Sequence, residues 1–253
     1  MEMAGAAALV TGGGSGLGAA TAAALAAAGA KVCVFDLNEA AAQAVAARIG
    51  GVAAAGDVAD AAAVAAALDA ACALGPLRLA VSCAGIAPPA RVVGRQGPHD
   101  LALFEKVLRV NLTGSFNVMR LAAERMQANE ATAPDGERGV IVNTASIAGY
   151  EGQVGQCAYA ASKAGVIGLT LPAARELAKT GIRVVTIAPG LMETPMLAGL
   201  PEPAREALVK LTLFPHRLGL AEDYARLVLA ICGNPMLNGE TIRLDGALRL
   251  PPA

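Results

Sequence analysis

The fold is decided by a glycine-rich stretch near the N-terminus, Thr11-Gly12-Gly13-Gly14-Ser15-Gly16-Leu17-Gly18. It follows a short apolar segment and precedes an alanine-rich segment of helical composition. Glycines between a strand and a helix allow a tight turn and a close approach to a pyrophosphate, which the free N–H groups of the helix attract. A plain turn is the alternative, because the spacing Gly12-x-x-x-Gly16-x-Gly18 differs from the usual GxGxxG. We expect a dinucleotide to contact Gly12, Ser15, Gly16, Leu17 and Gly18.

Segments that favour strand alternate with segments that favour helix along almost the whole chain. Strands are expected at residues 6–11, 31–36, 52–55, 77–82, 140–144, 182–187 and 241–244. Helices are expected at residues 21–28, 39–49, 60–73, 101–127, 157–179 and 221–231. Strands that are apolar on both faces are typical of a parallel sheet covered by helices on both sides. The sequence predicts an α/β fold: one Rossmann-type domain over residues 1–253, with a doubly wound parallel sheet of about seven strands.

Charge and composition exclude several classes of function. The net charge of −1 gives no electrostatic case for binding nucleic acid or an anionic membrane. No run of about 20 apolar residues predicts a membrane span, and residues 3–10 lack the features of a signal peptide. The five cysteines lack a CxxC pair, which indicates reduced thiols and a cytoplasmic protein. The two histidines lie far apart, so no metal site is expected.

Other cofactor contacts are expected where the strands end. Asp36 ends the second predicted strand, where a carboxylate accepts hydrogen bonds from ribose hydroxyls and repels a 2′-phosphate. Its neighbours supply no basic residue, so we expect NAD rather than NADP; the alternative role for Asp36 is to cap the next helix. The residues that follow the third and fourth strands are expected to line the adenine and ribose groove: Asp57, Val58, Cys83, Ala84 and Gly85.

Tyr159 and Lys163 are four residues apart on a predicted helix and therefore share one face. A fixed cation beside a phenol is expected to lower its pKa, so that Tyr159 can exchange a proton with an alcohol or carbonyl while hydride moves. Ser146 follows the strand at 140–144 and can hydrogen-bond the same substrate oxygen. The alternatives are an unrelated surface pair and a turn serine. The rival tyrosines, Tyr150 and Tyr224, have no basic residue four positions on.

On these motifs the chain resembles the short-chain dehydrogenase/reductase family over its whole length. The motifs that carry the resemblance are Thr11-Gly12-x-x-x-Gly16-x-Gly18, Cys83-Ala84-Gly85, Val110-Asn111-Leu112, Ser146, Tyr159-x-x-x-Lys163 and Pro189-Gly190. The resemblance implies that Ser146 positions the substrate oxygen and Tyr159 is the acid/base. It implies that Lys163 binds the nicotinamide ribose and Asn111 supports a proton-relay water. Contacts to the nicotinamide are implied for Pro189, Gly190 and Thr194.

Within this family the chain is most similar to the type 2 3-hydroxyacyl-CoA dehydrogenases, also called 17β-hydroxysteroid dehydrogenase type 10. The similarity is carried by segments that include 81–87, 116–121, 151–156, 169–175, 187–191 and 238–247. It implies NAD-dependent, reversible oxidation of (S)-3-hydroxyacyl-CoA to 3-oxoacyl-CoA in fatty acid metabolism, by a homotetramer. Substrate contacts are expected from Ser146, Tyr159, Gln156 and Met192.

The segment at about residues 191–219 is expected to form a substrate lid. It is rich in apolar residues, which suits a hydrophobic substrate, although packing against the main body accounts for part of them. A hydroxysteroid or broad secondary-alcohol dehydrogenase is therefore the alternative function. A non-enzymatic NAD-binding sensor is a third possibility. The presence of Ser146, Tyr159, Lys163 and Asn111 together argues against it.

Overall fold

The computed structural model describes residues 2–132, 134–193 and 202–252. Its centre is a seven-stranded sheet in the order β3-β2-β1-β4-β7-β8-β9. Every strand in it runs parallel to its neighbours. The strands are β1 (Ala7–Thr11), β2 (Lys31–Asp36), β3 (Val52–Ala55), β4 (Leu77–Ser82), β7 (Gly139–Thr144), β8 (Ile182–Pro189) and β9 (Thr241–Leu244). The predicted doubly wound parallel sheet is confirmed.

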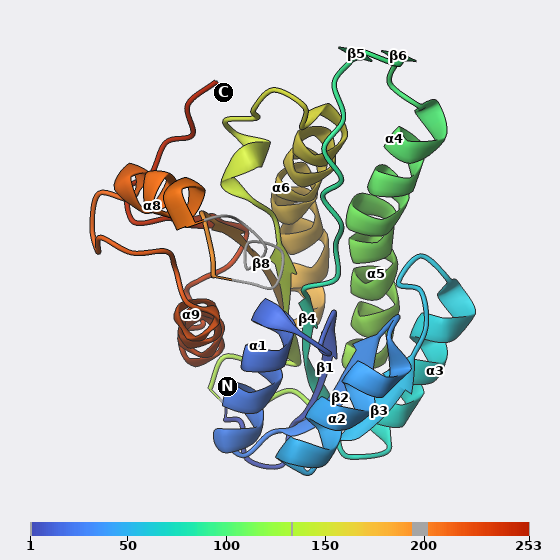
Figure 1. Cartoon of the computed structure of the whole chain (residues 1–253). Helices are drawn as coiled ribbons and strands as arrows, with labels where there is room; N and C mark the ends of the chain where they lie inside the picture. Colours follow the sequence, from blue (N-terminus) through green and yellow to red (C-terminus); the bar gives the residue numbers. More distant parts are fainter. Residues whose placement is uncertain (1, 133, 194–201, 253) are drawn as a thin grey trace.

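Helices cover both faces of the sheet, as Figure 1 shows. One face packs against α1 (Gly16–Ala27), α2 (Glu39–Ile49) and α9 (Ala221–Gly233). The other packs against α3 (Ala61–Cys72), α5 (Gly114–Gln127) and α6 (Cys157–Leu177). The central strands are buried on both sides; all five residues of β1 and all eight of β8 are buried. Double coverage explains why these strands are apolar throughout rather than alternating.

The local signals for helix ends act as the sequence suggests. Asp60 caps α3, since its carboxylate accepts hydrogen bonds from the N–H groups of Ala62 and Ala63. Gly50 ends α2 in the left-handed conformation, at φ 66°, which glycine adopts without a steric penalty. These ends place the following loops at the edges of the sheet.

The structure differs from the prediction at several helices. The helix expected at 101–127 is divided into α4 (Leu101–Leu108), a π-helical turn (Arg109–Thr113) and α5. The first helix begins at Gly16, five residues earlier than expected, because the glycine loop turns directly into it. Some elements of the described residues were not predicted. They include α8 (Glu202–Leu211) and a hairpin of β5 (Val93–Gly94) and β6 (Gly97–Pro98), which projects from one end of the molecule in Figure 1.

Among the described residues, no helix is long and apolar enough to cross a membrane. Within the same ranges, no group of three or more His, Cys, Asp or Glu side chains could hold a metal ion.

Candidate active site

The glycine loop is packed too closely for side chains. Gly12 has a φ of 61°, and a Cβ added there would lie 2.7 Å from the backbone nitrogen of Ala84. Ser15 is the N-cap of α1, with an extended backbone, and its hydroxyl makes no capping hydrogen bond within the described residues. The first turn of α1 therefore presents backbone N–H groups beside three consecutive glycines, which is the geometry that a pyrophosphate requires. Leu17 packs partly buried against the core, and Gly16 has a φ of 48°.

Asp36 lies against this loop. Its carboxylate accepts hydrogen bonds from the backbone N–H groups of Gly14 and Asn38, each at 2.9 Å. The cap of α2 is Asn38, whose side chain accepts from Ala41 N at 3.1 Å. The alternative role of Asp36 as the helix cap is therefore wrong. A carboxylate beside a phosphate-type loop can accept hydrogen bonds from the ribose of a dinucleotide, so the residues present fit this group.

The other expected cofactor residues differ in their surroundings. Asp57 accepts from Ala59 N at 2.9 Å and pairs with Arg109 at 3.1 Å. Val58 is buried and packs against Gly114, where a Cβ would lie 2.6 Å from it. The N–H of Ala84 donates to the Thr11 hydroxyl at 3.4 Å, which holds the end of β4 beside the glycine loop.

Ser146, Tyr159 and Lys163 meet at the carboxyl edge of the sheet. Ser146 follows β7, and its hydroxyl caps a short turn by accepting from Ala148 N at 3.1 Å. It also hydrogen-bonds the phenol of Tyr159, on the first turn of α6. Lys163, one turn further along α6, places its ammonium 5.7 Å from the centre of the Tyr159 ring. The structure thus brings a hydroxyl, a phenol and an ammonium group into one site, which can move a proton to or from a bound oxygen.

The pKa values in this cluster differ from the expectation. Loss of hydration raises the pKa of Tyr159, and the hydrogen bond from Ser146 offsets only part of this rise. The pKa of Tyr159 is therefore raised rather than lowered as expected, because burial outweighs the hydrogen bond from Ser146. Burial also lowers the pKa of Lys163 from 10.5 to about 8. Its ammonium donates to the backbone oxygen of Thr144 at 2.7 Å.

Asn111 lies in the π-helical turn between α4 and α5 and is fully buried. Its side-chain amide accepts from Ile86 N at 2.8 Å and donates to Ile86 O at 2.9 Å and to Ser162 Oγ at 3.0 Å. A Cβ added at Gly85 would lie 3.2 Å from Asn111 Oδ1 and 3.6 Å from Lys163 Nζ. Asn111 therefore fixes the loop after β4 against α6 and belongs to the same site.

A buried polar group behind Lys163 was missed in the sequence. Tyr224 on α9 is fully buried, and its hydroxyl lies 2.7 Å from the hydroxyl of Thr144. The thiol of Cys83 contacts both hydroxyls, at 3.7 Å from Thr144 and 3.8 Å from Tyr224. Thr144 ends β7, so the rule that chemistry collects at carboxyl ends of strands could have found it. Tyr224 carried no comparable signal, because only the tertiary fold brings α9 beside β7.

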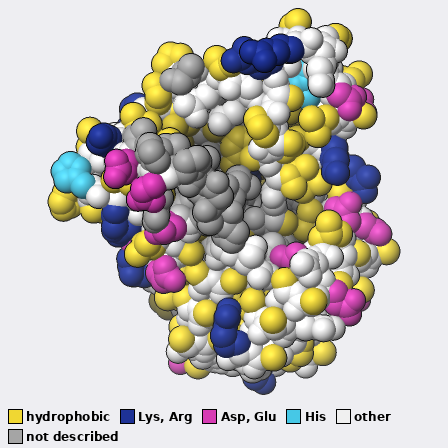
Figure 2. Space-filling model, in the orientation of Figure 1, with side chains coloured by type: hydrophobic (Ala, Val, Ile, Leu, Met, Phe, Trp, Pro, Cys, Tyr) yellow, Lys and Arg dark blue, Asp and Glu magenta, His cyan; other side chains and the backbone are white. Residues whose placement is uncertain are grey.

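Among the expected substrate contacts, Gln156 is the residue before α6 and exchanges hydrogen bonds with Gln153. Pro189 ends β8, and Gly190 N donates to Leu244 O at 2.9 Å. Met192 is buried, and it lines a cavity of about 300 Å³ between the end of β9 and the segment before α9. Figure 2 shows this face of the molecule hollowed, with hydrophobic side chains on the wall toward α4. Thr194 lies outside the described residues.

Comparison with known proteins agrees with this geometry. The family model for short chain dehydrogenases matches residues 6–204. The chain is 52% identical over 252 residues to 3-hydroxyacyl-CoA dehydrogenase type-2 of Drosophila melanogaster, covering 98% of each protein. It is 51% identical over 255 residues to the Homo sapiens protein of that name, covering 98% of this chain and 97% of the relative.

A solved structure extends the likeness to the whole fold. The crystal structure of 3-hydroxyacyl-CoA dehydrogenase type-2 from Mycobacterium avium superimposes with a TM-score of 0.95 and is 45% identical in sequence. The match covers 98% of both chains. The chain therefore belongs to the short chain dehydrogenase family and is an oxidoreductase.

Proposed function

We propose that the protein catalyses the reversible, NAD-dependent oxidation of a secondary alcohol to a ketone. The observation that carries this proposal is the contact of the Tyr159 phenol with Ser146, one helical turn from the Lys163 ammonium. Proton transfer at one oxygen, with hydride transfer at the attached carbon, is the reaction that such a site serves.

The cofactor would be held along the carboxyl edge of the sheet. The glycine loop and the N-terminus of α1 would bind the pyrophosphate, and Asp36 would accept from the adenosine ribose. Lys163 would donate to the nicotinamide ribose. When bound, the nicotinamide supplies the hydride acceptor for oxidation and the donor for reduction. We assign the remaining contacts to Asp57, Val58, Cys83, Ala84, Gly85, Pro189, Gly190 and Thr194.

Tyr159 is the group that moves the proton. Its raised pKa keeps the phenol protonated at neutral pH, which is the acid form that carbonyl reduction needs. In the oxidation direction the phenol must lose that proton, and a protonated Lys163 one helical turn away favours the phenolate. Ser146 holds the substrate oxygen beside the phenol. We propose that Asn111 holds a water molecule that relays the proton away from the site, because Asn111 lies close to Lys163.

The substrate that we propose is (S)-3-hydroxyacyl-CoA. The proposal is supported by the activity in the names of the relatives and by the hydrophobic wall of the hollow in Figure 2. We propose that residues 1–253 form one domain and that residues 191–219, of which 194–201 lie outside the described residues, form its substrate lid. We propose that Gln156 and Met192 contact the acyl part. We also propose a cytoplasmic homotetramer. The half-exposed Phe116 on α5 and Leu171 on α6 suit burial between subunits, which light scattering would test.

Oxidation of NADH in the presence of acetoacetyl-CoA tests the activity. The wild type is expected to turn over, and Tyr159→Phe to lose turnover by roughly 100-fold or more, the usual contribution of an acid/base group. Tyr150→Phe is the matched control, because Tyr150 is half exposed and the substitution removes its hydroxyl while keeping the ring. Absence of turnover on every carbonyl compound by the wild type would refute the enzyme proposal. Turnover of simple ketones or ketosteroids but not acyl-CoA would select the broader dehydrogenase.

The choice of cofactor is tested at Asp36. Asp36→Asn keeps an acceptor oxygen for the Gly14 N–H but removes the charge that repels a 2′-phosphate. We expect the preference for NADH over NADPH to fall by about tenfold or more. Asp60→Asn, at the exposed cap of α3, is the control and is expected to leave the preference unchanged. An unchanged preference in Asp36→Asn would show that other residues select the cofactor.

A further inference from the structure

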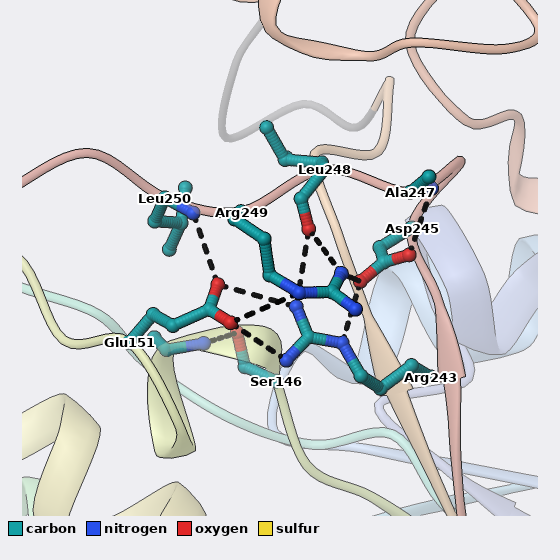
Figure 3. A network of polar contacts seen from close by, with 9 residues as sticks. Ser146, Glu151, Arg243, Asp245, Ala247, Leu248, Arg249 and Leu250 are labelled. Atoms are coloured by element: carbon teal, nitrogen blue, oxygen red, sulfur yellow. Dashed lines mark hydrogen bonds and ion pairs between the residues drawn. The ribbon is translucent and has the colours of Figure 1, made fainter.

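Arg243, near the end of β9, is the centre of a polar network that Figure 3 shows. Its guanidinium donates to both carboxylate oxygens of Glu151, at 2.9 and 3.2 Å, and to Asp245 at 2.7 Å. It also lies over the ring of Tyr150, 5.2 Å from the ring centre. The pKa of Glu151 is lowered chiefly by the hydrogen bond from Arg243, so its carboxylate stays charged. Arg243 thus joins two acidic residues that lie almost a hundred positions apart in the chain.

The same network fixes the C-terminal segment, residues 248–252. Arg243 donates to the backbone oxygen of Leu248 at 3.1 Å, and Leu250 N donates to Glu151 at 3.0 Å. Arg249 pairs with Asp245 at 3.2 Å. The C-terminal segment therefore lies over the loop that contains Glu151, as Figure 3 shows from close by.

That loop, residues 150–156, connects the Ser146 turn to α6. Beyond Glu151 it is held by two further bonds to the C-terminal segment: Gln153 Nε2 donates to Pro251 O at 3.2 Å, and Val154 N donates to Pro252 O at 3.1 Å. Gln153 in turn hydrogen-bonds Gln156, three residues before Tyr159. The loop between Ser146 and Tyr159 thus receives its outer support from the C-terminal segment.

On its other side the network reaches the loop after β8. A Cβ added at Gly190 would lie 2.8 Å from Asp245 Cβ, so the backbone of Gly190 packs directly on Asp245. Arg243 therefore couples Asp245, which packs on the proposed nicotinamide contact Gly190, with Glu151 in the loop 150–156. We call this loop the substrate loop, because it contains the proposed substrate contact Gln156. Both connections are charge-assisted hydrogen bonds, which are the stronger kind.

We propose that Arg243 is a positioning residue, which sets the distance between the substrate loop 150–156 and the Gly190 loop by binding Glu151 and Asp245 together under the C-terminal segment. The inference rests on the proposed reaction at Tyr159. It assigns to Arg243 and Glu151 no contact with substrate. Their effect is on the affinity for the carbonyl substrate and leaves the chemistry of the acid/base group intact.

Kinetics of Arg243→Gln and Glu151→Gln test this role. For each variant we expect KM for the carbonyl substrate to rise about tenfold, while KM for NADH and kcat stay within about twofold. The double variant is expected to show no more than the larger single effect, since both changes break one coupling. Because Arg243 and Glu151 are partly exposed, salt should screen the pair. The wild-type KM for the carbonyl should therefore rise between low and high NaCl, and that of Arg243→Gln should not.

A truncation and a control separate positioning from stability. Ending the chain at Arg249 removes the hydrogen bonds that Leu250, Pro251 and Pro252 make with the loop but keeps Arg243. This truncation should raise KM for the carbonyl substrate by less than Arg243→Gln does. Arg125→Gln is the matched control, because Arg125 is similarly exposed (19% against 22%) and pairs with Asp69 at 2.8 Å between α5 and α3. Arg125→Gln should leave KM for the carbonyl unchanged.

Hydrogen exchange makes the inference independent of activity. The amides of Val154 and Gln156 should exchange faster in Arg243→Gln and in the truncated chain than in the wild type or Arg125→Gln. Unchanged exchange there, or a carbonyl KM that stays at the wild-type value in both Arg243→Gln and the truncated chain, would overturn the positioning role. A wild type without turnover would instead refute the proposed function, while the exchange experiment would still decide whether Arg243 holds the loop.

Discussion

A buried cation lies at each end of strands β7 and β8: Arg183 at the amino end and Lys163 at the carboxyl end. The two cations have different partners. At the amino end, Arg183 pairs with Glu137 at 2.8 Å and donates to the backbone oxygens of Ile231 and Leu237, at 3.0 and 2.8 Å. At the carboxyl end, Lys163 donates to the backbone oxygen of Thr144. Among the described residues, no carboxylate forms a salt bridge with Lys163.

The difference indicates that the cation at the amino end stabilises the fold, whereas the cation at the carboxyl end serves the reaction. Arg183 and Glu137 neutralise each other, and Arg183 also satisfies carbonyls at the end of α9. The charge on Lys163 is not neutralised in this way, and burial therefore lowers its pKa to about 8. A buried charge of that kind costs folding free energy and is characteristic of a functional site. The two ends should thus respond in opposite directions when each cation is replaced by an apolar side chain.

The largest expected effect is at the amino end. Arg183→Met removes the guanidinium that bonds the buried Glu137 carboxylate and leaves the α9 carbonyls facing an apolar side chain. Breaking a buried pair in this way costs about 3–5 kcal/mol. Urea unfolding of Arg183→Met and wild type, with Arg183→Lys as the conservative variant, measures this loss. A loss below about 1 kcal/mol would mean that the pair contributes no more than a surface salt bridge and that the comparison fails.

Replacement of the other cation should have the opposite sign. Lys163→Met removes a buried charge and leaves one backbone oxygen unpaired, so we expect the free energy of unfolding at pH 7 to rise by about 2 kcal/mol. Turnover should be lost in the same variant, because the proposed ammonium contact of the nicotinamide ribose is gone. The urea series used for Arg183 provides the measurement. A Lys163→Met protein that is less stable than the wild type would contradict the comparison.

The pH dependence gives a sharper form of that test. The pKa of Lys163 is 10.5 in the unfolded reference and about 8 in the folded protein, so between these pH values the unfolded chain binds more protons. Stability of the wild type therefore rises with pH through this window relative to Lys163→Met, which lacks the group. The advantage of the variant should be complete below pH 8 and should shrink as the pH approaches 10.5. A stability difference that is constant from pH 7 to 10 would show that Lys163 is not titrating.

The same comparison explains what could be predicted from the sequence. Asp36, Ser146, Tyr159 and Lys163 were recognised because parallel strands bring their carboxyl ends to one edge, and because spacing along one helix fixes which side chains share a face. The strands and most helices followed from apolar runs and caps such as Asp60. These are local signals, and among the residues that carry them the structure brings Ser146, Tyr159 and Lys163 together.

The features that were missed depend on pairs far apart in the chain. Glu137 and Arg183 are 46 positions apart, and Thr144 and Tyr224 are 80 positions apart. No periodicity links such residues before the sheet order is known. The π-helical turn at Asn111 was missed for a related reason: the amide of Asn111 bonds the Ile86 backbone, 25 positions away in the chain.

The smallest expected effect on stability is that of Tyr224→Phe. This substitution tests whether Tyr224 supports the fold, as Arg183 does, or the reaction, as Lys163 does. Tyr224→Phe removes one buried hydrogen bond to Thr144 and keeps the ring in place, so stability should fall by about 1 kcal/mol. Thr144 retains its contact with the Cys83 thiol. If the group only supports the fold, turnover should stay within about twofold of the wild type, as in Tyr150→Phe. A large fall in turnover at unchanged stability would instead show that Tyr224 acts on Lys163 through Thr144, and that the functional end extends one layer deeper into the sheet.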